Sequence, residues 1–250
     1  MISKIRSVLF FLGYAGLTFI ISVLIISLFW LLPPRRRYYL YALWCRMVIV
    51  WLRITSNVTY EIEGKENIPD YPVIIFSNHQ STWETIFLYQ LFTPVCPILK
   101  KELLEIPFWG WALRLQRPIA IDRSKPREAG KSLLKQGAER LQEGASVLVF
   151  PEGTRAPTGK LGKFSRGGAQ LAVATETEVI PALHNAGKHW PAGTTRKNPG
   201  TIKLIIGQPI QTTGKTSKEV NLEFLAWVDS RRHELGLEYA SEPGAVDEVL

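Results

Sequence analysis

Cysteine is scarce in this 250-residue chain, which contains only Cys45 and Cys96. Two cysteines cannot form the several disulfides that hold small secreted folds together, so a disulfide-rich domain is excluded and a reducing environment is favoured. Acidic residues are also in short supply, because 22 aspartates and glutamates face 30 lysines and arginines, giving a formal net charge of +8 at pH 7. We therefore expect an anionic partner: nucleic acid, a membrane surface or a phosphorylated substrate.

Several catalytic and nucleotide-binding motifs are absent as well. The chain contains no G-x-S-x-G nucleophile elbow, no H-E-x-x-H zinc helix, no G-x-G-x-x-G fingerprint and no C-x-x-C pair. The segment from Gly153 to Leu161 resembles a phosphate-binding P-loop. It has one residue too many between its glycines, however, and Leu161 stands where a serine or threonine would bind magnesium. The enzyme classes that use these motifs are therefore not expected.

A long apolar run is present near the amino terminus. Residues 8–32 hold no charged side chain, and as a helix they would extend about 38 Å, whereas the hydrocarbon layer of a bilayer is about 30 Å thick. The run is followed by Pro33-Pro34-Arg35-Arg36-Arg37 rather than by the small residues of a signal-peptide cleavage site. We therefore predict a retained membrane helix over residues 8–32. A buried core helix is the alternative.

The next stretch, residues 38–52, is rich in aromatic and aliphatic residues but is interrupted by Arg46. This composition predicts an interfacial helix at the level of the lipid headgroups. Because arginines 35–37 follow the apolar run, the positive-inside rule favours the cytoplasmic side for the rest of the chain. Residues 1–54 are thus predicted to form a membrane anchor and residues 55–250 a globular domain. Full spanning and insertion into one leaflet both stay open.

Short β-branched runs alternate with amphipathic stretches beyond residue 55. This alternation predicts an α/β fold with a mixed, largely parallel sheet flanked by helices. The predicted strands are 58–63, 73–76, 119–121, 147–150, 179–183 and 202–206. The predicted helices are 83–92, 126–143, 166–176 and part of 216–240. The last seventeen residues carry five acids and no bases, and arginines adjoin the apolar sequence. This distribution favours a membrane surface over nucleic acid as the partner.

Polar side chains directly follow two of the predicted strands, at the edge where open α/β sheets bind ligands. In the first segment, His79 comes just after a strand and Glu84 lies at the start of the next helix. A general base needs an imidazole whose second nitrogen is held by an acceptor, which a carboxylate at this spacing can provide. The same segment fits a capping box, with Ser81 as N-cap and Glu84 at the third helical position. The spacing alone leaves both interpretations open.

The second segment, Phe150 to Arg155, suits an anionic ligand. Pro151 ends the predicted strand, Gly153 lets the backbone approach a ligand closely, and Arg155 carries a planar guanidinium that matches phosphate oxygens. The alternative is an ordinary strand-to-helix turn with a solvated arginine. Further basic residues extend the positive charge or form a solvated face: Lys160, Lys163 and Arg166.

Structural roles are favoured for the other candidate nucleophiles and bases. Cys96 lies in an apolar region and is expected in the core. His184 and His189 flank a predicted loop, while His233 lies on a charged helical face. A structural or solvent-exposed role is therefore expected for all three histidines.

Four segments together resemble the motifs of one family, the 1-acyl-sn-glycerol-3-phosphate acyltransferases. The family motif N-H-x-x-x-x-D resembles Asn78 to Glu84, with glutamate replacing aspartate; the extra methylene shifts the carboxylate by about 1.5 Å at most. The motif F-P-E-G-T-R matches Phe150 to Arg155 without a change. The family's second motif resembles three segments of this chain, residues 100–103, 106–110 and 121–123. Its fourth motif resembles residues 179–182.

The resemblance implies a glycerolipid acyltransferase-like fold and the transfer of a fatty acyl group to the sn-2 hydroxyl of lysophosphatidic acid, giving phosphatidic acid. The acyl donor would be a thioester, either acyl-CoA or acyl carrier protein. Because a thioester is already activated, the reaction needs a base, a phosphate clamp and oxyanion stabilisation, and no metal or bound cofactor is implied. The implied partners are membrane lipids, lysophosphatidic acid and the thioester donor, with no nucleic acid.

The resemblance also implies roles for individual residues. His79 would be the general base and Glu84 the residue that orients it. Arg155 and Lys100 would hold the phosphate, with Arg123 as a further candidate. The glycerol part of the acceptor would be bound by other residues of the third motif: Glu152, Gly153 and Thr154. Backbone amides near residues 79–82 are candidates for stabilising the oxyanion.

Two alternatives to this function remain. Within the same enzyme class, the acceptor could be another lysolipid or glycerol 3-phosphate. From a different class, the chain could be a noncatalytic membrane protein that binds anionic lipid through its basic loops. The expected location is a membrane, namely the bacterial inner membrane with the catalytic domain on the cytoplasmic side.

Overall fold

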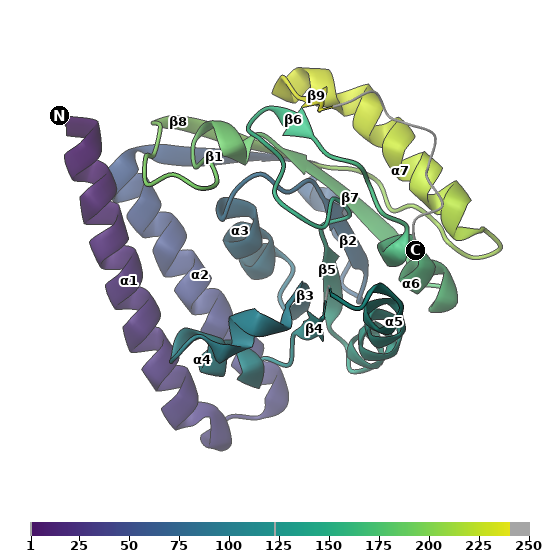
Figure 1. Ribbon diagram of the computed structural model, residues 1–250, viewed down its shortest axis with the longest axis horizontal. Coiled ribbons are helices and arrows are strands. Elements are labelled where there is room, and N and C mark those ends of the chain that lie inside the picture. Colours follow the sequence, from purple (N-terminus) through teal and green to yellow (C-terminus); the bar gives the residue numbers. More distant parts are fainter. Residues whose placement is uncertain (1, 123, 241–250) are drawn as a thin grey trace.

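A seven-stranded sheet runs through the centre of the computed structural model, which describes residues 2–122 and 124–240 (Figure 1). The strands lie in the order β1, β8, β7, β2, β5, β3 and β4; β7 pairs antiparallel with β8, and the other pairs in this sheet are parallel. Their bounds are Val58–Glu63 (β1), Ile74–Ser77 (β2), Val95–Lys100 (β3), Ile119–Ile121 (β4), Ser146–Val149 (β5), Val179–His184 (β7) and Gly200–Ile206 (β8). A separate parallel pair consists of Lys160–Leu161 (β6) and Glu238–Tyr239 (β9). The predicted mixed, largely parallel sheet is confirmed.

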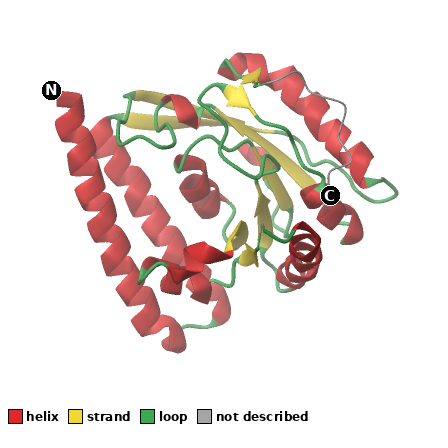
Figure 2. Ribbon diagram, viewed as in Figure 1, coloured by secondary structure: helices red, strands yellow, loops and turns green. Residues whose placement is uncertain are grey.

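Helices cover both faces of this sheet (Figure 2). Every residue of β2, β5 and β7 is buried, which explains their continuous apolar runs. Along β2, Ile75 contributes to the apolar cluster under α1 to α4, whereas Ile74 and Phe76 contribute to the cluster under α5 to α7. This alternation follows from the two-residue side-chain period of a strand.

The helices of the globular part agree closely with the predicted ranges, except for a short helix over residues 109–115 that was not predicted. Their bounds are Trp83–Leu91 (α3), Trp109–Leu115 (α4), Pro126–Gln142 (α5), Gly167–Ala174 (α6) and Ser217–Arg231 (α7). Helix α7 begins with a complete capping box formed by Thr216 and Glu219. Short 3-10 turns complete the chain: Phe29–Leu31 (η1), Lys65–Asn67 (η2), Lys101–Glu105 (η3), Ala186–Lys188 (η4) and Arg232–Leu235 (η5).

The amino-terminal segments form a helical hairpin along one side of the molecule, made of α1 (Ile2–Leu28) and α2 (Pro34–Ser56) (Figure 1). Residues 5–31 contain an 18-residue window with a mean hydropathy of 2.4 and are long and apolar enough to cross a membrane, by length and composition. Helix α2 is longer than the predicted 38–52 and packs against α1 and α3, while Arg46 stays exposed on its outer side. The hairpin therefore shares an apolar cluster with the sheet, and the proposed division at residue 54 stays a prediction.

Strands β2 and β5 are adjacent and parallel, with Phe76 opposite Val149. Their carboxyl ends therefore deliver the loops after Ser77 and Val149 to the same edge of the sheet. These two loops contain the polar segments that the sequence singled out.

Candidate active site

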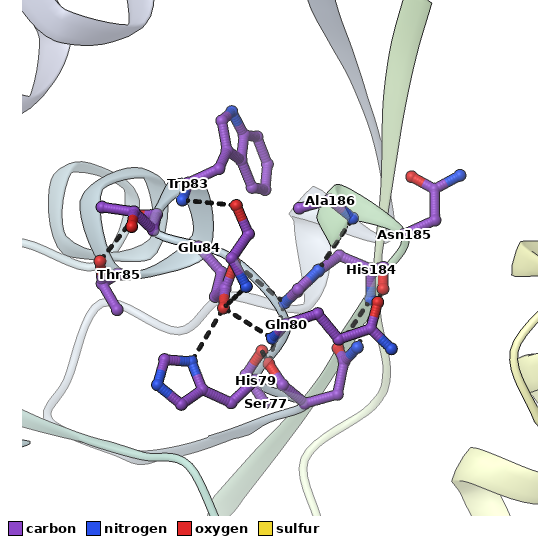
Figure 3. A network of polar contacts seen from close by, with 12 residues as sticks. Ser77, His79, Gln80, Trp83, Glu84, Thr85, His184, Asn185 and Ala186 are labelled. Atoms are coloured by element: carbon purple, nitrogen blue, oxygen red, sulfur yellow. Dashed lines mark hydrogen bonds and ion pairs between the residues drawn. The ribbon is translucent and has the colours of Figure 1, made fainter. Parts of the chain in front are cut away.

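The side chains of His79 and Glu84 are hydrogen-bonded at this edge (Figure 3). The His79 Nδ1 atom lies 2.8 Å from the Glu84 Oε1 atom. His79 belongs to the loop after β2 and its side chain is 14% exposed, whereas Glu84 lies in the first turn of α3 and is fully buried. No hydrogen bond engages the His79 Nε2 atom among the described residues. The ring thus has one nitrogen held by a carboxylate and the other available to a ligand.

The Glu84 Oε1 atom also accepts two backbone hydrogen bonds, from Gln80 N at 2.9 Å and Ser81 N at 2.7 Å. Burial raises the pKa of Glu84. Neighbouring His184 and the hydrogen bond from His79 lower it by a larger amount, so the net pKa lies below the ordinary carboxyl value. Glu84 is therefore ionised at neutral pH. An ionised acceptor at Nδ1 fixes the imidazole tautomer that leaves a lone pair on Nε2.

The capping-box alternative describes only part of this arrangement. Glu84 does reach back to the Ser81 amide, as a capping-box glutamate would. The Ser81 hydroxyl, however, accepts from Trp83 N at 3.0 Å, and the N-cap residue of α3 is Thr82, without a side-chain cap. Glu84 therefore both caps the helix and holds His79.

Glu152 joins the two loops from the other side. Its Oε1 atom accepts from His79 N at 2.8 Å, and its Oε2 atom accepts from Gly162 N at 2.8 Å. A Cβ atom at residue 162 would lie 2.8 Å from Oε2, so glycine allows this close approach. Burial raises the pKa of Glu152 to about 7, although both N–H donors favour the ionised form.

These contacts correct one expectation about the oxyanion. The backbone amides of His79, Gln80 and Ser81 all donate to the carboxylates of Glu84 and Glu152. The expectation that these three amides stabilise an oxyanion is therefore wrong, because their hydrogens are already engaged. They instead hold the two carboxylates around His79.

The other residues of the third motif line the same loop. The Arg155 Nε atom donates to Ser81 O at 2.9 Å, which ties the two loops together, and no hydrogen bond engages its terminal nitrogens among the described residues. Gly153 has a φ of +69°, a backbone conformation that glycine adopts without strain. Gly153, Thr154 and Arg155 are all exposed. The anion-binding group of the predicted site is thus accessible beside His79.

The second-motif residues lie farther along the sheet edge. Lys100 is the exposed last residue of β3, which is separated from β2 by β5. No hydrogen bond or ion pair connects Lys100 with His79 or Arg155 in the described part of the chain. Arg123 lies outside the described residues. Its neighbour Asp122 pairs with Lys101 at 2.6 Å.

Two further residues at the site were not selected from the sequence. The ring of Phe150 stacks on that of His79, with centroids 4.2 Å apart and planes 17° apart. His184, at the end of β7, is fully buried next to Glu84, with its Nε2 atom 3.8 Å from Glu84 Oε2. Phe150 is the first residue of the recognised F-P-E-G-T-R segment, which offered a signal. For His184 only its place at a strand end could have indicated a role.

Comparisons with known proteins agree with this arrangement. A family model described as Acyltransferase matches residues 59–185. The chain is 47% identical over 238 residues to a 1-acyl-sn-glycerol-3-phosphate acyltransferase of Pseudomonas aeruginosa, covering 94% of this chain and 93% of that protein. It is 35% identical over 219 residues to a chloroplastic protein of that name from Arabidopsis thaliana, covering 83% of this chain and 60% of the other.

A solved structure gives the same result for the fold. The crystal structure of the 1-acyl-sn-glycerophosphate (LPA) acyltransferase PlsC from Thermotoga maritima matches with a TM-score of 0.77 and 26% identity, covering 93% of this chain and 97% of that one. Both the sequence match to the Pseudomonas protein and the structural match to the Thermotoga protein extend over more than nine-tenths of this chain. The chain therefore belongs to the 1-acyl-sn-glycerol-3-phosphate acyltransferase family.

Proposed function

We propose that the chain transfers a fatty acyl group from acyl-CoA or acyl carrier protein to the sn-2 hydroxyl of 1-acyl-sn-glycerol 3-phosphate, with His79 as the general base. The products are phosphatidic acid and a free thiol. The observation that carries the proposal is the 2.8 Å contact between His79 Nδ1 and the buried Glu84, which leaves Nε2 accessible. The family relationship supports the acceptor and the reaction.

The chemistry follows from the orientation of the imidazole. Nδ1–H donates to Glu84, so Nε2 carries the lone pair and accepts the proton of the acceptor hydroxyl as its oxygen attacks the thioester carbonyl. The resulting imidazolium is stabilised by the Glu84 carboxylate. Collapse of the tetrahedral intermediate breaks the carbon–sulfur bond, and the departing sulfur takes the proton from the imidazolium. The base returns to its neutral form.

Substrate binding would use the basic groups at the same edge. Arg155 has a planar fork suited to phosphate oxygens and is held by Ser81 O beside His79. Lys100 and Arg123 are proposed to contribute from the second motif, and Glu152, Gly153 and Thr154 from the third. The mechanism includes no metal and no bound cofactor, because the thioester supplies the activated acyl group.

The proposed setting is a membrane surface, the cytoplasmic side of a bacterial inner membrane. The acceptor and the product are lipids, so an apolar amino-terminal helix would keep the sheet edge close to the lipid headgroups. The proposed partners are accordingly membrane lipids, lysophosphatidic acid and the thioester donor.

A thiol-release assay on the purified full chain tests the function. We expect acyl-CoA to release free thiol when lysophosphatidate is added, and more slowly with glycerol 3-phosphate or an uncharged monoacylglycerol. His79→Ala should lose about 100- to 10,000-fold in kcat, the usual contribution of general-base catalysis. His233→Ala, which changes an exposed histidine on η5, is the matched control.

The results separate the proposal from its rivals. A folded His79→Ala variant that keeps most of its turnover would exclude the general-base role. Faster turnover with glycerol 3-phosphate or another lysolipid than with lysophosphatidate would identify that compound as the preferred acceptor. Vesicle binding without thiol release from either acyl-CoA or acyl carrier protein would favour a noncatalytic lipid-binding protein.

A further inference from the structure

The buried side chain of His184 lies directly behind the loop that carries His79. Strand β7 runs parallel to β2, with Ala182 opposite Ser77, so His184 lies two residues beyond that pair. The Asn78 side chain ties the two loops together, because its Nδ2 atom donates to His184 O at 2.9 Å and its Oδ1 atom accepts from His184 N at 3.0 Å. These two bonds fix the backbone of His184 next to the loop that carries His79, and Figure 3 shows the His184 side chain near Glu84.

The neighbours of the ring define its tautomer. Ala186 N donates to the His184 Nδ1 atom at 3.2 Å, so Nδ1 presents its lone pair and the proton is on Nε2. The Nε2 atom lies 2.9 Å from Asn78 O, which accepts this proton. Burial lowers the pKa of His184, so the ring is neutral at pH 7. His184 thus presents an N–H dipole, and not a full charge, toward its surroundings.

The His184 Nε2 atom also lies near Glu84. The Glu84 Oε1 atom accepts three hydrogen bonds, whereas no hydrogen bond reaches Oε2 among the described residues. The Oε2 atom lies 3.8 Å from His184 Nε2, and both side chains are fully buried. A buried carboxylate oxygen without a partner is costly, and a nearby N–H dipole reduces that cost.

We propose that His184 is a positioning residue for the His79–Glu84 pair: its Nε2–H stabilises the ionised carboxylate and keeps Oε1 turned toward His79. This inference rests on the proposed function. The Glu84 carboxylate lies between the two imidazoles, with His79 Nδ1 2.8 Å from Oε1 and His184 Nε2 3.8 Å from Oε2.

In the part of the chain that the structure describes, three titratable groups lie around Glu84. His79 approaches from the loop after β2, His184 from β7, and Glu152 from the loop after β5, where its negative charge opposes that of Glu84. The two histidines therefore favour the ionised carboxylate, while burial and Glu152 disfavour it. Removing the His184 donor shifts this balance toward proton binding by the pair.

The test is the pH profile of thiol release for substitutions at His184. His184→Leu removes the N–H at similar volume. We expect kcat to fall by about 10-fold, equivalent to about one pKa unit, because a nearby dipole that stabilises a buried charge is removed, with KM for lysophosphatidate largely unchanged. We also expect the acid limb of kcat/KM to move to higher pH, because the pair binds its proton more readily. His184→Gln, which keeps an N–H at nearly the same reach, should restore most of both properties.

A purely structural role for His184 predicts different results. It would lower the melting temperature and the amount of active protein without moving the acid limb, and the same loss would occur in a Glu84→Gln background. On our proposal, His184→Leu adds little to Glu84→Gln. His189→Gln, in a loop where Nδ1 contacts Asn198 O, is the matched control and should keep the wild-type pH profile.

Every outcome of this experiment decides one question. If His184→Leu does not fold, His184→Gln is compared with His184→Asn, whose amide is too short to reach Glu84. Equal pH profiles for these two variants would overturn the proposal. Full activity of His79→Ala, by contrast, would overturn the proposed base itself. Inactivity of His79→Ala with an unshifted acid limb in His184→Leu would overturn only the role of His184.

Discussion

Two carboxylates, the buried Glu84 of α3 and the half-buried Glu152 of the loop after β5, approach His79 in different ways. Glu84 binds the imidazole ring, while Glu152 binds the backbone amide of the same residue. Their environments push their pKa values apart. The donors around Glu84 lower its pKa, whereas burial raises the pKa of Glu152 to about 7. At neutral pH one carboxylate is fully ionised and the other takes up a proton readily.

The raised pKa of Glu152 predicts a pH dependence of stability. Between pH 4.5 and 7 the unfolded chain has lost this proton while the folded protein retains it. The folded state therefore binds more protons in this window, and the free energy of unfolding falls as the pH rises through it, by about 1 to 3 kcal/mol from this group. Glu152→Gln removes the contribution.

Melting curves of both proteins at pH 5 and pH 8 in the same detergent check this prediction. We expect the melting temperature of Glu152→Gln, relative to the wild type, to be higher at pH 8 than at pH 5. Contributions of the other carboxylates cancel in that difference. A difference that does not change with pH would show that Glu152 ionises normally.

Residue patterns predicted the His79–Glu84 pair but not the contacts that hold it. Spacing and the polar context of His79 indicated the pair, and its geometry agrees. The prediction that the amides of Gln80 and Ser81 stabilise an oxyanion was wrong, because both donate to Glu84. A spacing pattern does not reveal which acceptor lies next to which amide. His184 is 100 residues beyond Glu84 in the sequence, and only the pairing of β7 with β2 brings the two together.

Helices α1 and α2 approach closely because of a glycine. A Cβ atom at Gly13 would lie 2.2 Å from the Trp51 indole nitrogen, whereas one at Gly16 meets no atom within 4 Å. Trp51 Nε1 in turn donates to Phe10 O at 3.1 Å. Gly13 therefore allows the indole to reach the backbone of α1.

Gly13→Ala is expected to separate the two helices locally. The methyl group displaces the Trp51 ring and weakens its bond to Phe10 O, at a cost of about 1 to 3 kcal/mol for overpacking. Gly16→Ala is the matched control, and it should be neutral or stabilising because alanine favours a helix. Thermal unfolding in detergent measures both. Equal melting temperatures would mean that the hairpin tolerates the displaced indole.

Among the elements, strong periodicity was the reliable signal. The range 126–143 predicted α5 almost to the residue, and the β-branched runs predicted β1, β2, β5, β7 and β8. Strand β3 was not recognised, because Pro94 and Pro97 interrupt its apolar pattern. For α2, the sequence indicated an interfacial helix, but its 3.6-residue period lets Trp44, Val48 and Leu52 pack inward while Arg46 stays exposed.

One side of the whole molecule presents apolar side chains to its surroundings. The outer face of α1 exposes Leu12 by 68% and Leu24 by 42%, and the neighbouring turn before α4 exposes Phe108, whose ring contacts Phe19 of α1. Helix α7 lies on the opposite side of the molecule (Figure 1). An apolar surface of this kind is typical of a membrane-contacting face.

Lysine substitutions on α1 test this face. The double variant Leu12→Lys and Leu24→Lys places two charges in the apolar surface, each costing about 2.5 to 3.5 kcal/mol at a bilayer centre. We expect it to bind vesicles of anionic phospholipid much more weakly in a flotation assay. Leu222→Lys, which changes a residue 45% exposed on α7, is the control and should bind normally. Equal flotation of all three proteins would place the membrane contact elsewhere.

The sequence by itself determined the chemistry available to this protein: an apolar amino-terminal helix, an α/β alternation, and the segments that identify the family. These features depend on local composition and on the spacing of apolar residues, both of which can be read directly from the sequence. The tertiary structure alone decided which donors surround Glu84, that Glu152 binds a backbone amide, and that His184 lies next to Glu84. Those contacts depend on strand register and burial, because folding brings groups that are distant in the sequence within about 3 Å, and burial strengthens the hydrogen bonds that then form.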